Sequence, residues 1–328
     1  MRIAIFDCNN LAFKSWSVMK ETRGGLLKTS MGIPTTVIFG LLRSFNAIAE
    51  KSKGESFGRI VCCWDTSGSY YRKKIYPLYK SHRKYVDMKD YFEELDSARI
   101  YLKRFGINQI IAKGIEADDV IGYVAHSLAK LGHEVTVVSD DKDFLQLCRK
   151  NVKIFRPVKL EYITSSFVKQ EFGMKPRLIP RIKALTGEDT DFIPGICDVD
   201  EKNKKLIKVG FGEKAAMKLL ENGRTLDQAI DSCDNERWKE RLIQKREMVH
   251  ISYLLARIRT KLKWYEDWEK EILKDVIEKC LKQKIVKSKK IIRIANSLEL
   301  KSIHVPTILR RLGVKIEGHV PIQGGIRT

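Results

Sequence analysis

Acidic side chains recur in this sequence where short apolar runs end and where a helical pattern begins. The acids concerned are Asp7, Asp65, Glu116, Asp118, Asp119, Asp140, Asp141 and Asp143. Taken alone, any of them could cap or begin a helix, where the helix dipole favours negative charge. Gathered at one place, they would repel each other and destabilise the fold unless cations bound between them. The pattern therefore indicates a cation site.

The chemistry of this acidic group favours hard metal ions. Oxygen ligands suit Mg²⁺ or Mn²⁺, and the group contains no histidine or cysteine that would indicate zinc. Two such ions about 4 Å apart can activate a water and stabilise the leaving oxygen of a phosphodiester. The acids therefore predict a two-metal site that acts on phosphate esters.

Short apolar segments rich in β-branched residues would position these acids. They cover residues 2–6, 59–64, 109–111 and 134–139, with a further segment at 152–155. Amphipathic helical patterns at 35–51 and 117–131 lie between them. This alternation predicts an α/β fold, with a mainly parallel central sheet flanked by helices. Ligands bind beyond the carboxyl ends of such strands, which is where the acids stand.

Two regions depart from this pattern. Residues 67–104 are charged and tyrosine-rich, so we expect them to project from the sheet rather than to join a core. Beyond about residue 180 the strand signals fade and basic helical patterns follow. Residues 201–328 contain 30 Lys and Arg against 17 Asp and Glu, which is +13 of the chain's net +21. We therefore expect the surface that attracts a polyanion to lie in this helical half, residues 201–328. Such a basic face could also simply be solvated.

The composition of the whole chain also favours a polyanionic partner. A net charge of +21 suggests a polyanionic partner, because lysine and arginine displace the counterions condensed on phosphates. Attraction to anionic lipid is the alternative, but no basic amphipathic helix stands out as an anchor. No segment has the pattern of a signal peptide or a membrane span. The seven cysteines include no CxxC pair, so neither disulfides nor structural zinc are indicated, and we expect an intracellular protein.

The acidic segments resemble a known family. Residues 114–120 (GIEADDV) and 139–147 (SDDKDFLQL) resemble the two acidic signatures of the 5′-nuclease family, which contains flap endonucleases and 5′-3′ exonucleases. Residues 7–14 (DCNNLAFK) resemble its first motif, and 76–83 (YPLYKSHR) its arch entry. Residues 186–195 (TGEDTDFIPG) and 210–216 (GFGEKAA) resemble its last acidic motif and its helix-three-turn-helix. The resemblance covers roughly residues 1–225.

The resemblance implies roles for individual residues. A first metal would be held by Asp7, Asp65, Glu116, Asp118 and Asp141. A second, more loosely held metal would be served by Asp119, Asp143, Glu188 and Asp191. Lys80 and Arg83 would reach the scissile phosphate, with Lys14 nearby. Tyr79 would stack on a base. The duplex would be bound by Gly210, Gly212 and Lys214, where the family holds K⁺. Each of these cations could instead belong to a solvated face.

The chain departs from the family at three places. Glu188 stands where the family has aspartate, Phe192 stands where it has asparagine, and residues 197–208 look like an insertion. The resemblance implies a PIN-like or 5′-nuclease fold, with a helical arch at about 67–104. We expect an α/β nuclease domain at 1–185 and a basic helical DNA-binding region at 186–328, whose helix-three-turn-helix spans about 186–225.

The expected activity is cleavage of DNA near 5′ ends by a monomeric nuclease in replication or repair. Branched or 5′-ended DNA is the expected partner, RNA·DNA hybrids are a further substrate, and replication proteins are further partners. A PIN-type ribonuclease shares a similar acidic sheet end and is the second reading. A catalytically silent structure-recognition module is the third, and the complete set of mutually repelling acids counts against it.

Overall fold

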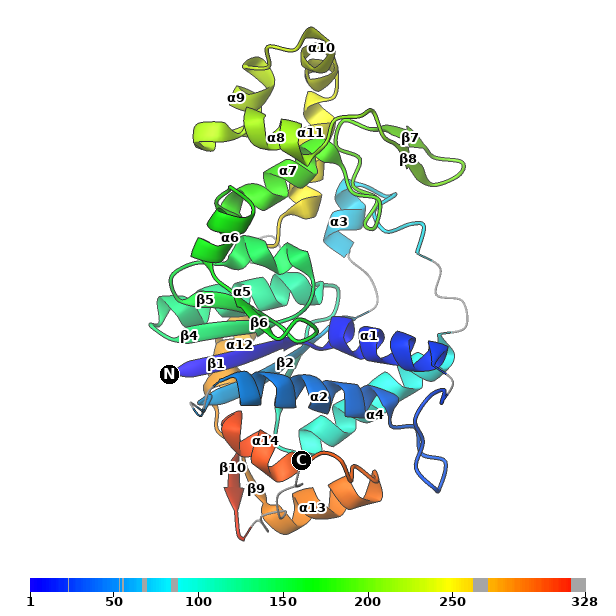
Figure 1. Ribbon diagram of the computed structural model, residues 1–328, viewed down its shortest axis with the longest axis vertical. Coiled ribbons are helices and arrows are strands. Elements are labelled where there is room, and N and C mark those ends of the chain that lie inside the picture. Colours follow the sequence, from blue (N-terminus) through cyan, green and yellow to red (C-terminus); the bar gives the residue numbers. More distant parts are fainter. Residues whose placement is uncertain are drawn as a thin grey trace.

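A six-stranded sheet forms the centre of the molecule (Figure 1). The computed structural model describes residues 1–319, except 23, 53, 55, 67–69, 84–87 and 262–270. The strands are β1 (Arg2–Asp7), β2 (Arg59–Trp64), β3 (Asn108–Ile111), β4 (Glu134–Val138), β5 (Val152–Arg156) and β6 (Glu161–Ile163). Their order is β3-β2-β1-β4-β5-β6.

The sheet is parallel except at one edge. β1 to β5 pair in parallel, and β6 pairs antiparallel with β5. The predicted α/β fold with a mainly parallel sheet is therefore confirmed. The five predicted strands match the observed ones to within a residue at most ends, because buried strands read as continuous apolar runs. The sequence did not reveal β6, which has only three residues and one buried position.

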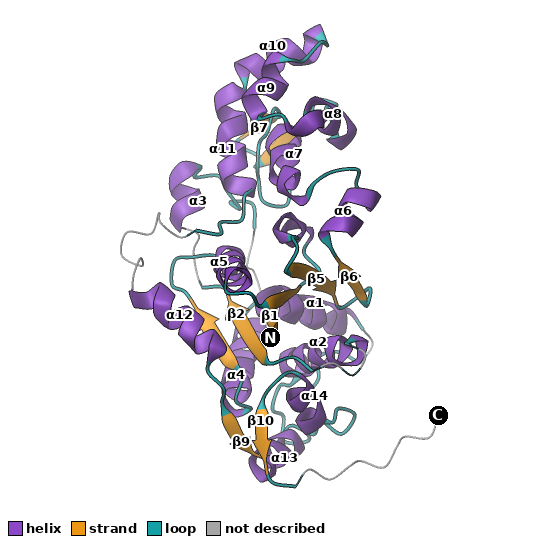
Figure 2. Ribbon diagram, turned by 90° about the vertical axis from the view of Figure 1, so that its left-hand side faces the viewer, coloured by secondary structure: helices purple, strands orange, loops and turns teal. Residues whose placement is uncertain are grey.

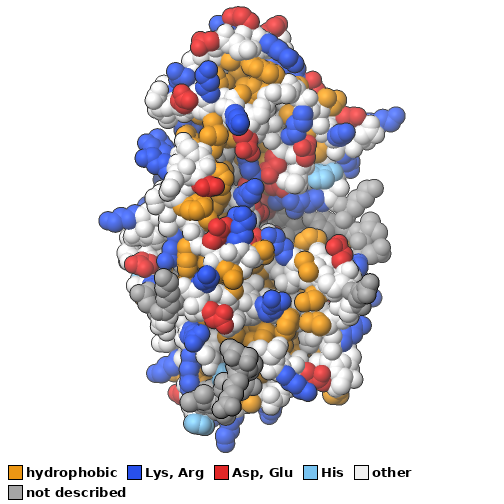
Figure 3. Space-filling model, in the orientation of Figure 1, with side chains coloured by type: hydrophobic (Ala, Val, Ile, Leu, Met, Phe, Trp, Pro, Cys, Tyr) orange, Lys and Arg blue, Asp and Glu red, His pale blue; other side chains and the backbone are white. Residues whose placement is uncertain are grey.

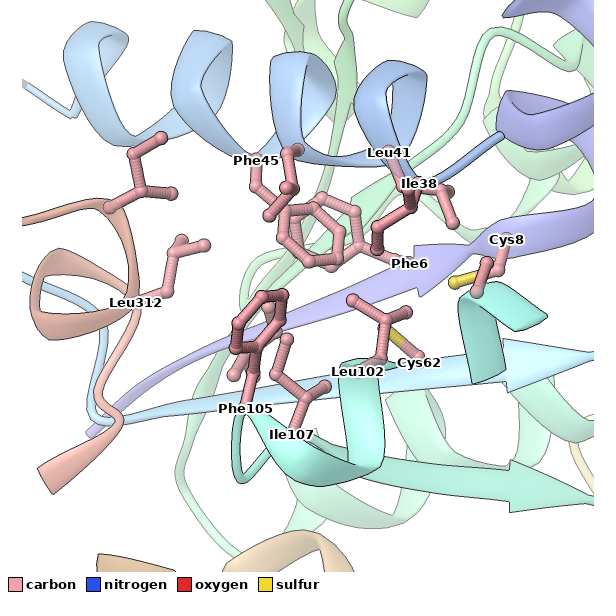
Figure 4. Packing of buried hydrophobic residues seen from close by; sticks show 14 of the residues in the cluster. Phe6, Cys8, Ile38, Leu41, Phe45, Cys62, Leu102, Phe105, Ile107 and Leu312 are labelled. Atoms are coloured by element: carbon pink, nitrogen blue, oxygen red, sulfur yellow. The ribbon is translucent and has the colours of Figure 1, made fainter. Parts of the chain in front are cut away.

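Helices cover both faces of the sheet. One face carries α1 (Cys8–Glu21), α2 (Thr36–Lys51) and α4 (Lys89–Arg104), and the other carries α5 (Ala117–Lys130) and α12 (Glu271–Leu281). The apolar stripe of α2 is buried against β1, where the rings of Phe6 and Phe45 meet at 4.3 Å between centroids (Figure 4). Phe105 and Leu312 belong to the same cluster. These helices hold the strand ends in a fixed arrangement.

The expectation that residues 67–104 project from the sheet is wrong for their second half. Tyr91, Leu95, Ala98 and Leu102 of α4 are buried in the core. Their spacing places them on one helical face, while the charges that made the segment look polar lie on the others. The first half, with α3 (Tyr70–Ile75) and the turn at 76–83, packs instead against α11 (Arg246–Ala256) and the acidic loop at 188–193.

The upper part of the molecule is helical (Figure 2). It contains α6 (Ser165–Glu171), α7 (Ile179–Thr186), α8 (Glu213–Leu219), α9 (Leu226–Asp231), α10 (Glu236–Gln244) and α11 (Arg246–Ala256). The short 3-10 helices are η1 (Lys142–Leu147), η2 (Pro176–Leu178) and η3 (Glu221–Gly223). The segment that looked like an insertion, residues 197–208, forms an antiparallel hairpin of β7 (Asp198–Asp200) and β8 (Lys205–Ile207).

The last described residues do not join this helical part. β9 (Ile285–Lys287), α13 (Ser288–Ser297), α14 (Val305–Arg311) and β10 (Lys315–Glu317) pack against α2 and the end of α4, below the sheet in Figure 1. Phe57 donates its backbone N–H to the Arg311 carbonyl at 2.7 Å. A side chain at Gly313, which has φ +85°, would meet the Gly58 backbone at 2.4 Å. We call residues 282–319 the C-terminal unit. It differs from the expectation of one helical region over 186–328.

Within the described ranges, none of the helices has the length and apolar character needed to cross a membrane.

Candidate active site

The first acidic group lies at the carboxyl ends of β1, β2 and β4. Asp7 ends β1 and caps α1, since its Oδ1 accepts from the Asn10 N–H at 3.3 Å. Its Oδ2 accepts from the Ser139 hydroxyl at 2.8 Å. Burial, together with the nearby Asp141 and Asp65, raises the pKa of Asp7 to about 7. A buried carboxyl among other carboxyls is thus poorly stabilised as an anion.

Asp65 and Asp118 belong to the same group. Asp65 follows β2 and accepts from the Ala117 N–H, the first residue of α5, at 2.6 Å. Burial, and then the charge of Glu116, raises the pKa of Asp65. Burial, and then the charges of Asp7 and Asp141, raises the pKa of Asp118. Glu116 precedes α5 and Asp141 follows β4, so the five acids predicted for the first metal lie at one edge of the sheet. Among the described residues, however, these five do not bring three ligand oxygens within 4.8 Å of one another.

A second acidic group lies beside the first. Asp143, Glu188 and Asp191 each offer a carboxylate oxygen, and these oxygens lie within 4.8 Å of one another. Burial, and then Asp141 and Glu188, raises the pKa of Asp143 to about 7, although Lys183 acts against this. The structure therefore brings three of the four acids predicted for the second metal together, including Glu188, which departs from the family pattern.

Sequence reasoning missed Lys183, on α7. Its ammonium lies 2.8 Å from both carboxylate oxygens of Glu188 and also contacts Asp143. Burial acts to lower the pKa of Lys183, but the carboxylates of Asp143 and Glu188 raise it overall, so the side chain is a cation. No motif indicated it, and the only signal is a lysine five residues before Glu188, in the helix that leads into the last acidic motif.

Lys80 and Arg83 lie between the two acidic groups. The ammonium of Lys80 is 3.2 Å from Oε2 of Glu116 and 3.6 Å from Oδ2 of Asp191. Arg83 places Nη2 2.5 Å from Oδ1 of Asp191. Lys80 has a left-handed backbone, with φ +53°, and its N–H donates to the Asp191 carbonyl at 3.0 Å. Such a conformation persists only where the surroundings fix it, so Lys80 is held at the acids, and Arg83 lies there through its pair with Asp191.

Tyr79 does not have the exposure predicted for a stacking residue. Its side chain is buried, with 2% of the residue exposed. The hydroxyl donates toward Oε2 of Glu116 at 3.3 Å and Oδ2 of Asp191 at 3.2 Å. In this arrangement Tyr79 links the two acidic groups, and no face of its ring is open to a base. The sequence could not reveal this, because the tyrosine is buried by α11 and Ile193, far along the chain.

Asp119, predicted as a ligand of the second metal, has buried partners of its own. Both of its oxygens accept from Arg72, at 2.9 Å each, and Oδ1 accepts from the Arg259 N–H at 2.9 Å. Arg72 makes a further contact with Glu116 at 3.3 Å. Asp119 is fully buried. Its carboxylate is already satisfied, so we leave it out of the ligand set.

Lys14 and Asp140 form a pair at the edge of the site. The ammonium of Lys14 lies 3.3 Å from Oδ2 of Asp140, and Oδ1 of Asp140 accepts from the Val158 N–H at 3.4 Å. Lys14 is the more exposed partner, with 44% of its side chain accessible. No role for Asp140 followed from the sequence, whereas in the structure it is the partner of the outermost predicted cation.

The predicted grip residues lie in the helical part, apart from the acids. Gly210 has φ +78°, and Gly212 precedes α8 with no atom within 4 Å of where a Cβ would be. Lys214 lies exposed in the first turn of α8. A cavity of about 510 Å³ adjoins this turn, lined by Lys208, Gly210, Trp238 and Arg241 among others. A ligand could therefore approach the backbone closely at Gly212.

The β7–β8 hairpin supports the turn that carries Lys80. Leu206 of the hairpin packs with Phe192 and Cys197 against Tyr76 and Leu78.

Figure 3 shows red acidic side chains gathered at mid-height on this face, with blue cations beside them. The arrangement can hold metal cations at the acids and a polyanion along the lysine and arginine side chains beside them.

Comparisons with known proteins agree with this geometry. Residues 2–173 match the family described as 5′-3′ exonuclease, N-terminal resolvase-like domain, and residues 174–279 match its C-terminal SAM fold. The chain belongs to the 5′-3′ exonuclease family. It is 30% identical over 259 residues to the 5′-3′ exonuclease of Aquifex aeolicus, which covers 79% of this chain and 82% of that one.

Longer relatives and solved structures are also similar. The chain is 30% identical over 309 residues to DNA polymerase I of Caldicellulosiruptor bescii, covering 88% of this chain and 33% of that protein. The chain thus spans about a third of this polymerase relative. A structure of T5 5′-exonuclease with bound zinc shares the fold, with TM-score 0.67, 17% identity and coverage of 86% and 98%. This chain is therefore an enzyme of the 5′-3′ exonuclease family and has its nuclease fold.

Proposed function

We propose that this chain is a divalent-metal-dependent nuclease that hydrolyses phosphodiester bonds near 5′ ends of DNA. The proposal includes 5′-3′ exonuclease and flap endonuclease activity on branched or 5′-ended DNA, activity on RNA in RNA·DNA hybrids, and a role of the monomer beside other replication or repair proteins. The observation that carries it is the meeting of two acidic groups with Lys80 and Arg83 at the carboxyl edge of the sheet.

The donor set suits two Mg²⁺ or Mn²⁺ ions. The proposed ligands of the first ion are Asp7, Asp65, Glu116, Asp118 and Asp141, and those of the second are Asp143, Glu188 and Asp191. All are oxygen donors, and the raised pKa values of Asp7 and Asp143 reflect the burial of anions that cations would stabilise. When bound, such ions supply charge that lowers the pKa of an attacking water and stabilises the leaving oxygen.

The side chains around the acids have complementary roles. Lys80 and Arg83 would neutralise charge that develops on the phosphate, because both cations lie beside the acids, Lys80 largely buried and Arg83 more exposed. Lys183 would hold Asp143 and Glu188 in their ionised, ligating form. Glu188 is longer than the family's aspartate, and Mg²⁺ commonly keeps several waters, so a bridging water would absorb the difference.

The helical part would bind the duplex without reading its sequence. Gly212 leaves space for a phosphate beside the backbone, and the exposed Lys214 adds a positive charge in the following turn. The proposed helix-three-turn-helix at about 186–225 would hold a K⁺ at this place. A T5 D15 flap endonuclease complex with DNA and metal ions shares the fold, at TM-score 0.61 and 17% identity, which supports DNA as the ligand.

The test is incubation of the purified protein with 5′-labelled flap, nicked and RNA·DNA substrates, with Mg²⁺ or with excess EDTA. We expect short 5′ products only with the metal, and full activity in EDTA would refute metal dependence. Asp118→Asn and Asp143→Asn should each lower the single-turnover rate by several orders of magnitude. Asp189→Asn is the matched control, since this exposed acid of the same loop pairs only with Lys208 among the described residues.

The same substrates separate the alternatives. A PIN-type ribonuclease would cut single-stranded RNA in preference to 5′-ended DNA. A catalytically silent module would bind the flap substrate and release it uncut at every metal concentration.

A further inference from the structure

The positive charge of the helical half is concentrated in the C-terminal unit. Residues 282–319 contain 10 Lys and Arg against 2 acids, which gives 10 − 2 = +8. Residues 201–281, which include the proposed duplex grip, contain 19 against 15, which gives 19 − 15 = +4. Both family models end at or before residue 279. The most cationic segment therefore lies outside the residues that the two family models match.

These cations lie on the surface of a well-packed unit. On α13, Ile291, Ile294 and Ala295 are buried against the core, while Lys289, Lys290 and Arg293 are exposed. The anchoring is extensive, since the unit also buries Val286, Val305, Ile308, Leu309 and Leu312 in the same core as the sheet. The exposed cations are therefore presented on a rigid surface rather than on a tail.

The charges are not compensated within the described part of the chain. No ion pair there involves any of the 10 cations, and Glu299, one of the two acids, accepts instead from Ser30. Lys289 and Lys290 lie three or four residues from Arg293 on one helix, where like charges destabilise each other. Burial and the charges of Lys103 and Lys282 lower the pKa of Lys284, so the crowding extends to the end of α4. Such crowding favours a polyanionic ligand.

The unit lies about one sheet length from the acids. It packs beside Phe57 and Gly58, at the amino end of β2, whereas the acids stand at the carboxyl ends. A strand of six residues such as β1 spans roughly 20 Å at about 3.3 Å per residue. Duplex DNA rises about 3.4 Å per base pair. Only an arm that extends well beyond the cleaved end would therefore reach the unit.

We propose that the C-terminal unit is a second nucleic-acid contact, which holds the phosphate backbone of a duplex arm at a distance from the cleaved end. The proposal rests on the proposed function for the identity of the ligand. It assigns the unit to binding and not to chemistry, because none of its cations is near the acidic edge. The surface recognises phosphates, so it should not depend on base sequence.

The experiment uses the full chain with Lys289→Gln, Lys290→Gln and Arg293→Gln combined. Fluorescence anisotropy in EDTA would measure binding of labelled flap DNA with hairpin-closed duplex arms of about 5 or about 40 base pairs, because about 5 base pairs span less than one sheet length. The control combines Lys130→Gln, Lys150→Gln and Lys169→Gln, three exposed lysines elsewhere whose loss lowers net charge equally.

We expect the first variant to bind the long-arm substrate at least about tenfold more weakly, with a salt dependence of log Kd shallower by about 1 to 3 units. Binding of the short-arm substrate and single-turnover cleavage at saturating enzyme should match the parent. Unchanged affinity for the long arm would overturn the proposal, and so would an equal loss in the control variant. Since binding is measured without metal, absence of cleavage would count against the proposed function alone.

Discussion

Arg72 and Asp119 offer the sharpest test of how the site is built. Arg72 donates hydrogen bonds to Asp119 through two nitrogens, to Glu116, and to the carbonyls of Leu255 and Arg257, at 2.8 to 3.3 Å. Both side chains are almost completely buried. The pair thus ties α3 and the end of α11 to the helix that carries Asp118. Replacement of Arg72 by methionine would leave a buried carboxylate without its counter-charge.

We expect Arg72→Met to lower the free energy of unfolding by about 3–5 kcal/mol, the range for one partner removed from a buried ion pair. Asp119→Asn keeps the shape and should cost less, about 1.5–3 kcal/mol, as for hydrogen bonds to a charged group. The double variant Arg72→Met with Asp119→Leu should recover part of the loss, because no unpaired charge remains. Lys279→Met, in the exposed pair with Asp275, is the control and should cost under about 1 kcal/mol.

Urea unfolding, followed by circular dichroism, measures these differences, and a Mg²⁺ titration of single-turnover cleavage measures the metal. If Asp119 is structural, Asp119→Asn should lower the urea midpoint while the Mg²⁺ concentration for half-maximal cutting stays near that of the parent. An unchanged midpoint with a much higher Mg²⁺ requirement would refute this reasoning and return Asp119 to the metal site. If Arg72→Met lowers the free energy of unfolding by less than about 1 kcal/mol, water screens the pair more than its buried geometry indicates.

Three further predictions concern the acids and cations. Lys80→Ala should reduce the single-turnover rate and leave duplex affinity near that of the parent, whereas Lys214→Ala should weaken binding and make its salt dependence shallower by about one unit; the reverse pattern would exchange their roles. Glu188→Gln should raise the Mg²⁺ concentration for half-maximal cutting, and Glu188→Asp should not; a Gln titration curve that superimposes on the parent would remove this residue from the site. Asp7 and Asp143 have pKa values of about 7, above those of an unfolded chain, so the folded state binds more protons and the metal-free protein should lose stability as pH rises from about 4 to 7. Thermal unfolding in EDTA at several pH values measures this loss, which should be smaller with both residues changed to asparagine, and a stability that increases over this range would contradict it.

The sequence by itself determined the sheet and the acids at its edge. A buried parallel strand is a continuous apolar run, and an acid directly after it must lie at the carboxyl edge, so the positions of Asp7 and Asp65 followed from local pattern alone. Glu116 and Asp118 followed from the start of an amphipathic helix after another strand. In each case the decisive information lies within a few residues of the acid.

Only the tertiary structure decided which partner each charged residue has. Asp118 and Asp119 are adjacent and chemically identical, yet the first belongs to the acidic group, while the second is held by Arg72, 47 residues away. Lys183 and the burial of Tyr79 were hidden for the same reason, because their contacts join distant segments. The charged outer faces of α4 likewise concealed its buried stripe. Periodicity reports which side of an element is apolar, but the contacts of a side chain depend on what packs against that side.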